Sequence, residues 1–112
     1  MNYSAGTIGA DVIKKNYLDH LIHRYYEYRK ADKSFGAYAH ANKFNYAEIH
    51  KSIESKFKAK TFFIPINRFQ EVCQYVQNRI DKTILAKTNK SEGNRNYSTF
   101  EEYEKEQSIK QK

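Results

Sequence analysis

Two histidines and a glutamate near the start of the chain have a spacing that could hold a metal ion. His20, His23 and Glu27 stand three and four residues apart, and residues with these spacings share one face of a helix. Imidazole and carboxylate groups are common zinc ligands, but neither an HExxH pattern nor a fourth ligand accompanies them. The pattern is more typical of a polar helix face with titratable surface histidines. We therefore expect no metal and no other cofactor.

Cys73, the only cysteine, is a candidate nucleophile. A reactive thiol needs an activating base and electropositive, partly exposed surroundings. Cys73 instead stands beside Val72 and Val76 on an apolar stripe, which predicts a buried structural thiol. The acidic residues are scattered, and the four glycines are too widely spaced to cradle a phosphate. The sequence therefore predicts a protein that is not an enzyme.

Aromatic and basic residues alternate in the segment HRYYEYRK, residues 23–30. Aromatic rings can stack on exposed bases while arginines bind phosphates, so such a cluster can hold a single strand. The alternative is that Tyr25 and Tyr28 follow the apolar stripe of a helix and pack inward, and we favour it for this pair. The remaining candidates for contact with a nucleic acid are Arg24, Tyr26 and Arg29.

A second set of cations flanks the only proline, Pro65. Its members are Lys51, Lys56, Lys58, Lys60, Arg68, Arg79, Lys82 and Lys87. If the two helices that carry them cross, one face would present several cations to a phosphate backbone, and binding would depend steeply on salt. A standard helix-turn-helix is disfavoured because its turn has three or four residues. The alternative is a set of solvated lysines at helix ends.

Length, composition and charge limit the class of protein. A chain of 112 residues, 39% hydrophobic and 29% charged, fits one globular domain rather than a disordered tail. The net charge of +7 favours nucleic acid, an anionic surface or an acidic protein as partner, although a charge of this size can also serve solubility. A single cysteine, no secretion signal and no long apolar run predict a cytoplasmic protein without a membrane span.

The first element that must position these residues is a long helix from Asp11 to about Asp32. Its apolar residues recur three or four apart, and Asp11 can cap its start. The stripe consists of Ile13, Tyr17, Leu21, Tyr25 and Tyr28. Residues 1–10 lack any periodicity and are expected to be flexible, and residues 34–44 are expected to form a loop.

Two further helices follow, each opened by a residue pair typical of a capping box. Asn45 with Glu48 precedes a stripe that ends at Phe57, and Asn67 with Gln70 precedes one that reaches Ile84. Between them, Pro65 excludes a continuous helix. Residues 60–66 are therefore expected to form an extended connector, with its large apolar side chains buried across the helices at about 1.5–3 kcal/mol each.

The resulting fold is mostly α, with three main helices and a short C-terminal one. A flexible loop is expected after Lys87, and Ser98 with Glu101 repeats the capping signal before the last helix. The single helical domain is expected over residues 11–104, with a frayed tail over 105–112.

Residues 46–80 resemble the C-terminal domain of phage antirepressors and Rha-type phage regulatory proteins. The motif positions are Lys56-Phe57, Thr61-Phe62, Ile64-Pro65 and Phe69, with Ile49, Ile53, Val72 and Val76 in the stripes. The interval from Phe57 to Pro65 is one residue shorter than the usual form. The resemblance implies a phage or prophage origin, a bacterial host cell and a regulatory, non-enzymatic role.

Two functions follow from these patterns. The first is a phage-type regulatory module that binds DNA or RNA through a basic helical face. The alternative is a phage-encoded inhibitor or partner of a host protein complex, such as a CRISPR or other defence nucleoprotein. The sequence leaves open whether the chain forms a homodimer.

Overall fold

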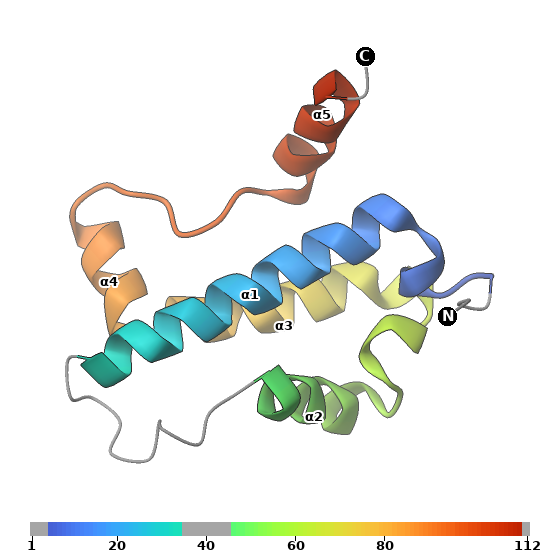
Figure 1. Cartoon of the computed structure of the whole chain (residues 1–112), viewed down its shortest axis with the longest axis horizontal. Coiled ribbons are helices and arrows are strands. Elements are labelled where there is room, and N and C mark those ends of the chain that lie inside the picture. Colours follow the sequence, from blue (N-terminus) through green and yellow to red (C-terminus); the bar gives the residue numbers. More distant parts are fainter. Residues whose placement is uncertain (1–4, 35–45, 111–112) are drawn as a thin grey trace.

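The two helices at the centre of the molecule lie side by side and run in the same direction (Figure 1). They are α1 (Val12–Ser34) and α3 (Phe69–Asp81). The structure, a computed structural model, describes residues 5–34 and 46–110, with only the backbone described for 32–34 and 108–110. Because α1 and α3 are parallel, side chains near the end of one helix meet side chains near the end of the other.

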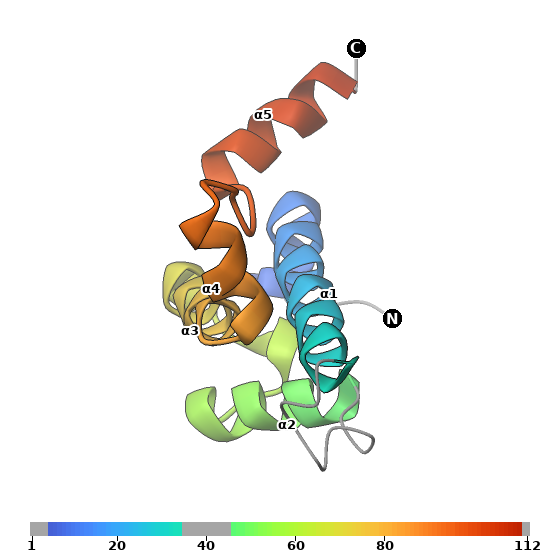
Figure 2. The same ribbon diagram turned by 90° about the vertical axis from the view of Figure 1, so that its left-hand side faces the viewer.

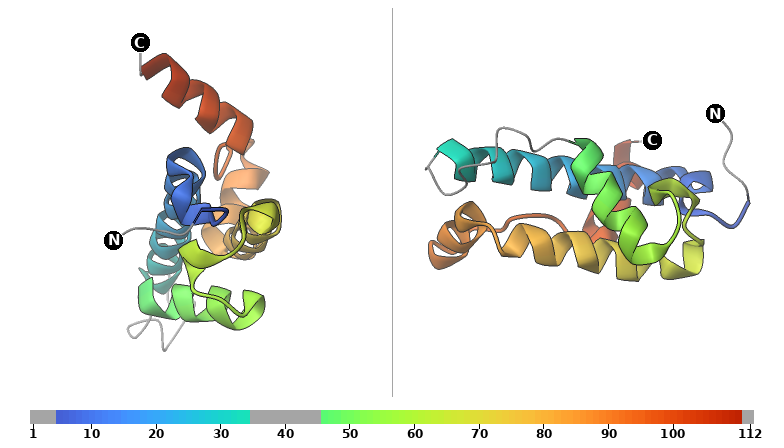
Figure 3. Two further views of the ribbon diagram at one scale, coloured as in Figure 1. Left: turned by 90° about the vertical axis from the view of Figure 1, so that its right-hand side faces the viewer. Right: turned by 90° about the horizontal axis from the view of Figure 1, so that it is seen from below.

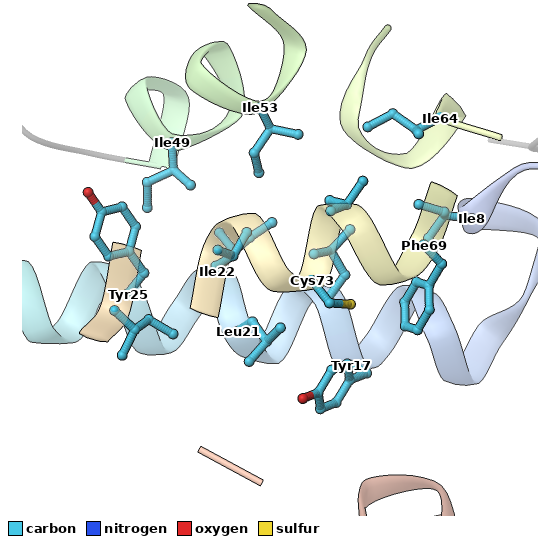
Figure 4. Close-up of a cluster of buried hydrophobic side chains, with 14 of the residues drawn as sticks. Ile8, Tyr17, Leu21, Ile22, Tyr25, Ile49, Ile53, Ile64, Phe69 and Cys73 are labelled. Atoms are coloured by element: carbon cyan, nitrogen blue, oxygen red, sulfur yellow. The ribbon is translucent and has the colours of Figure 1, made fainter. Parts of the chain in front are cut away.

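The apolar stripe predicted for α1 is confirmed from Tyr17 onward, whereas Ile13 is only partly buried. Tyr17, Leu21, Tyr25 and Tyr28 are all buried, and Figure 4 shows the first three within the cluster of buried side chains. The predicted cap is also present, since the Lys14 backbone N–H donates to Asp11 Oδ1 at 3.0 Å. That bond satisfies one of the amide groups that a helix start leaves without a partner.

Helix α2 (Tyr46–Phe57) crosses one face of the central pair (Figures 2 and 3). Its stripe residues Ile49, Ile53 and Phe57 are buried against that pair, whereas Tyr46 is 36% exposed. Asn45, the predicted cap of this helix, lies outside the described residues, as does most of the loop predicted over 34–44.

The connector between α2 and α3 differs from the extended segment predicted over 60–66. Two 3-10 turns, Thr61–Phe63 and Ile66–Arg68, flank an extended step at Ile64 and Pro65. Ile64 is fully buried, but Phe63 is 37% exposed. A 3-10 turn points successive side chains in different directions, so one face cannot bury them all.

The start of the chain docks on this connector, and the flexible start predicted over 1–10 is wrong for residues 5–10. The Ile8 N–H donates to the Ile64 carbonyl at 3.0 Å, and the Ile66 N–H donates to the Gly6 carbonyl at 2.8 Å. Ile8 is fully buried. These residues are ordered by partners far along the chain, and such partners leave no periodic signal in the local sequence.

The third predicted helix is divided in two, because α3 ends at Asp81 and α4 (Ile84–Ser91) follows. Thr83 caps α4, and its Oγ1 accepts from the Ala86 N–H at 3.2 Å while donating to the Ile80 carbonyl at 2.7 Å. Ile84, predicted as the last stripe residue, is therefore 44% exposed. The loop predicted after Lys87 begins later, beyond Ser91.

The caps predicted for the later helices also differ from those in the structure. No side-chain cap hydrogen bond precedes α3, because the Ile66–Arg68 turn leads directly into it. Before α5 (Phe100–Lys110) the capping pair is Thr99 and Glu102, one residue later than predicted. Helix α5 also continues past residue 104, where the domain was predicted to end.

The C-terminal segment lies on the side of the central pair opposite α2 (Figure 2). The Tyr17 hydroxyl donates to the Ser98 carbonyl at 2.7 Å, and the Tyr28 hydroxyl donates to Asn96 Oδ1 at 3.1 Å. Five α-helices and no strand occur among the described residues, apart from a single bridge between Thr7 and Pro65. The mostly α fold is confirmed.

Candidate functional site

A pocket of about 380 Å³ opens between α1 and α3 and collects three of the predicted binding cations. We call it the basic pocket. Its lining consists of Tyr25, Arg29, Tyr75, Asn78, Arg79, Lys82 and Thr83. No acidic residue lines it in the described part of the chain, so no carboxylate of the lining offsets its three positive charges.

Two tyrosines orient the arginines of the basic pocket. Arg29 Nη1 donates to the Tyr25 hydroxyl at 3.0 Å, and Arg79 Cζ lies 5.0 Å from the centre of the Tyr75 ring. Partial burial alone would lower the pKa of Arg79, but its interactions with the hydroxyls of Tyr25 and Tyr75 raise the pKa overall. Arginine is charged throughout the physiological pH range, and these contacts hold the Arg79 guanidinium in place.

Helix periodicity and parallel packing together build this pocket. Tyr25 and Arg29 stand four apart on α1, and Tyr75 and Arg79 stand four apart on α3, so each pair shares a helix face. Figure 4 shows the Tyr25 hydroxyl on the side of the central pair where Ile49 of α2 lies. Because α1 and α3 run in the same direction, the two pairs come together near the ends of both helices.

A second pocket, of about 240 Å³, adjoins the first along α3. It is lined by Lys56, Phe57, Glu71, Gln74, Tyr75 and Asn78, and it shares the last two with the basic pocket. Tyr75 lies between the two pockets. Its hydroxyl is hydrogen-bonded to the Ser52 hydroxyl, and its ring packs edge-to-face with the Phe57 ring, with 5.8 Å between the ring centres. We call the lining of both pockets, together with Arg68, the Tyr75 surface.

Among the described residues, the one acidic side chain that lines either pocket is already paired. Arg68 Nη2 lies 3.0 Å from Glu71 Oε2, and the Arg68 guanidinium also lies 4.8 Å from the centre of the Phe57 ring. The charge of Glu71 is therefore offset locally by Arg68. The other cations of the Tyr75 surface are Arg29, Lys56, Arg79 and Lys82.

The remaining predicted binding residues line neither of these two pockets. They are Arg24, Tyr26, Lys51, Lys58, Lys60 and Lys87. Lys51, Lys58, Lys60 and Lys87 are exposed, and Lys87 belongs to α4 rather than to the end of α3. The Tyr26 ring stacks on Tyr46, with 4.3 Å between the ring centres, so it has a packing partner already.

Sequence reasoning missed Tyr75 and Asn78. Both lie off the apolar stripe of α3, so the periodicity that identified the core gave no reason to select them. The spacing of Tyr75 and Arg79, which places an aromatic ring one turn before an arginine, was the available signal.

The predicted histidine and cysteine features can also be placed. His23 Nε2 lies 3.5 Å from Glu27 Oε1, and its other ring nitrogen contacts the Tyr46 hydroxyl. Burial lowers the pKa of His20, whose ring stacks on Tyr103. Within residues 5–34 and 46–110 no cluster of three or more histidine, cysteine or acidic side chains could hold a metal. Cys73 is buried, as predicted, and burial raises its pKa to about 12.

A larger pocket, of about 580 Å³, lies between the central pair and the start of α5. Phe69 and Phe100 form much of its apolar lining, and the polar lining is mostly amide side chains with one lysine and one glutamate, Lys14 and Glu101. Lys14 Nζ already lies 3.3 Å from Asp11 Oδ2. This pocket therefore lacks the excess of positive charge that marks the Tyr75 surface.

Comparison with known proteins gives no match to a family model, a curated protein or a solved structure. The resemblance of residues 46–80 to the phage C-terminal domain therefore stays a prediction. In the part of the chain that the structure describes, no helix combines the length and the apolar character needed to cross a membrane.

Proposed function

We propose that this chain is a small non-enzymatic regulatory protein that binds nucleic acid through the Tyr75 surface. The observation that carries the proposal is a set of five cations around two adjoining pockets whose only acidic residue is paired with one of them. Lysine and arginine groups bind phosphates by displacing condensed counterions, whatever the sequence of the strand. The resemblance to phage regulatory proteins supports a phage or prophage origin.

The arrangement favours contact with the backbone rather than a reading of base pairs. Within the Tyr75 surface, the cations come from α1, the end of α2, the 3-10 turn before α3, α3 itself and the residue that follows α3. Eleven residues separate α2 from α3, which is too long for the turn of a helix-turn-helix. We therefore expect binding that depends strongly on salt and weakly on sequence.

The test is to measure binding of random duplex and single-stranded oligonucleotides to the full chain across a salt series. Lys56→Gln/Lys82→Gln should reduce the slope of log K against log salt by about 2 for duplex DNA, because each lost phosphate contact removes about 0.9 from the slope. Lys90→Gln/Lys105→Gln is a matched control, since both lysines are exposed and line neither pocket. Absence of binding at low salt would refute the proposal.

A protein partner is the second candidate. Arg68 and Arg79 lie over the rings of Phe57 and Tyr75, and arginine and tyrosine are enriched at the centres of protein interfaces. An acidic patch on a host protein, such as a component of a defence nucleoprotein, fits a surface of this charge. A pull-down from a nuclease-treated bacterial lysate should then return one protein at a fixed ratio, and Arg79→Gln should abolish its recovery.

A further inference from the structure

The basic pocket forms one end of the Tyr75 surface. The two ends of this surface differ in charge. Toward α2 the surface continues into the second pocket, where Lys56 and the paired Arg68 lie. In the other direction α3 ends at Asp81 and α4 turns away from it (Figure 1). The end next to α4 holds Arg29, Arg79 and Lys82, which is the densest group of cations on the surface.

The charge of the basic pocket matches a phosphate monoester better than an internal phosphodiester. A monoester carries about −1.5 to −2 charges near pH 7 and three terminal oxygens, whereas a diester carries one charge. Three cations around about 380 Å³ offer more positive charge than a single diester needs. Asn78 adds an amide donor at the pocket wall. Thr83 contributes less, because its hydroxyl is engaged in capping α4.

The orientation of the arginines supports the same ligand. A guanidinium presents five N–H donors in a planar fork that binds two phosphate oxygens at once. Arg79 is packed over the Tyr75 ring, and Arg29 donates to the hydroxyl of Tyr25, a residue that is itself buried in the core. Because these contacts fix the side chains before a ligand arrives, binding loses less conformational entropy.

We infer that the basic pocket binds a phosphate monoester, namely the terminal phosphate of a nucleic-acid strand whose next nucleotides lie along the Tyr75 surface toward Lys56. The part of this inference that concerns the strand rests on the proposed function. The part that concerns the phosphate rests on the pocket alone. A free phosphate or a mononucleotide offers the same group without a strand.

The experiment compares single strands of one sequence that differ only at their ends. Labelled 12-nucleotide strands with a 5′-phosphate, a 3′-phosphate or only hydroxyl ends are titrated with the full chain by fluorescence anisotropy. We expect one of the two phosphorylated strands to bind about tenfold more tightly than the hydroxyl strand, the effect of about one charge-assisted hydrogen bond. Lys82→Gln and Arg79→Gln should each remove most of that preference.

Lys56→Gln is the matched control because it removes one charge from the other pocket. The substitution should weaken the binding of all three strands equally and leave the preference for the phosphorylated end intact. Lys82 and Lys56 are both exposed, so neither change is expected to disturb the core, and circular dichroism checks that helix content is retained. Arg79→Lys keeps the charge but loses the planar fork, and it should retain only part of the preference.

Mononucleotide and inorganic phosphate distinguish the sources of the phosphate. Adenosine monophosphate and phosphate should compete with the phosphorylated strand, and adenosine should not. Equal binding of all three strands would overturn the inference while leaving nucleic-acid binding intact. Stabilisation by inorganic phosphate that is lost in Lys82→Gln, with no binding of any strand, would support the phosphate site and refute the proposed function. No response to strands or to phosphate would refute both.

Discussion

Tyr25 combines two roles that the sequence presented as alternatives. Its ring is 4% exposed and belongs to the core, as the apolar stripe of α1 predicts. Its hydroxyl nevertheless reaches the basic pocket and accepts a hydrogen bond from Arg29. A tyrosine can do both because its polar atom stands at the far end of an apolar ring. At this position core packing and orientation of a surface cation are therefore properties of the same side chain.

Tyr25→Phe separates these two roles. The ring still packs, so the free energy of unfolding should change by about 1 kcal/mol or less. Without the hydroxyl, Arg29 and Arg79 lose a fixed partner, and affinity for a single strand should fall about three- to tenfold, or about 0.7–1.4 kcal/mol. Urea denaturation and fluorescence anisotropy give the two values.

Tyr28→Phe is the control for that substitution. Its hydroxyl bonds Asn96 on the C-terminal segment rather than a cation, so the change should cost about 1 kcal/mol of stability and leave affinity unchanged. If Tyr25→Phe binds strands as tightly as the unmodified chain, the hydroxyl does not position the arginines.

Buried thiol and phenol groups predict a loss of stability at high pH. Burial raises the pKa of Cys73 from 9.0 to about 12 and that of Tyr17 from 10.0 to about 12. A group with a raised pKa holds its proton more tightly in the folded chain, so unfolding releases a proton above the unfolded pKa and stability falls. Stability should be unaffected by these groups below pH 9 and should decrease from pH 9 toward pH 12.

Urea midpoints measured at intervals from pH 7 to pH 11 test this dependence. In Cys73→Ala the decline should begin nearer pH 10, because of the two groups only Tyr17, whose ordinary pKa is 10.0, remains. A midpoint that stays constant through pH 11 would show that these groups are not buried as described.

At the scale of elements, the boundary between α3 and α4 depends on one buried threonine. Apolar residues continue in helical register through Ile80 and Ile84, so the periodicity indicates a single helix. The chain turns instead because the Thr83 hydroxyl caps the second helix and bonds the end of the first. This turn ends the Tyr75 surface beside Lys82 and directs α4 away from it.

Thr83→Val keeps the shape of the side chain and removes its hydroxyl. The Ala86 N–H and the Ile80 carbonyl then lose a partner in a buried site, which should cost about 1–2 kcal/mol of unfolding free energy. Thr83→Ser retains the hydroxyl and should cost less, and Thr88→Val, at an exposed position, should have little effect. A cost for Thr83→Val no larger than that for Thr88→Val would contradict the cap.

At the scale of the whole molecule, three layers are joined through the central pair of parallel helices. Helix α2 covers one face, and residues 92–99 with α5 lie on the other (Figure 2). The start of the chain also docks on this assembly, because the backbone near Ile8 forms hydrogen bonds with the connector at Ile64 and Ile66. The connector is therefore held by the N-terminal residues as well as by the helices that it joins.

Ile8→Ala tests whether the N-terminal residues dock on the connector. Ile8 is fully buried, and replacing a buried isoleucine with alanine should cost about 2–4 kcal/mol through lost burial and a residual cavity. Val12→Ala is the control, since Val12 is 69% exposed and its truncation should change stability by less than about 0.5 kcal/mol. Equal and small effects of the two changes would mean that the start of the chain does not dock. Both values come from urea denaturation.

Local periodicity in the sequence was enough to identify α1, α2 and α3, the inward side of α1 and the burial of Cys73. It was enough because residues three and four apart share a helix face whatever surrounds the helix. The sequence also identified Arg29, Arg79 and Lys82, the three cations of the basic pocket, as candidate binding residues. The sequence did not indicate that these three cations meet, that Tyr75 stands among them, or that Lys87 lies on a separate helix.

Tertiary packing decided those features, together with the 3-10 turns of the connector and the docking of Ile8, whereas the break at Thr83 follows from a local cap that the periodicity does not reveal. Each depends on a partner from a distant part of the chain or on one side-chain hydrogen bond that competes with helix continuation. Which faces of α1 and α3 meet, and in which direction the helices run, follows from how all the apolar stripes bury one another at once. No single stretch of sequence specifies that arrangement.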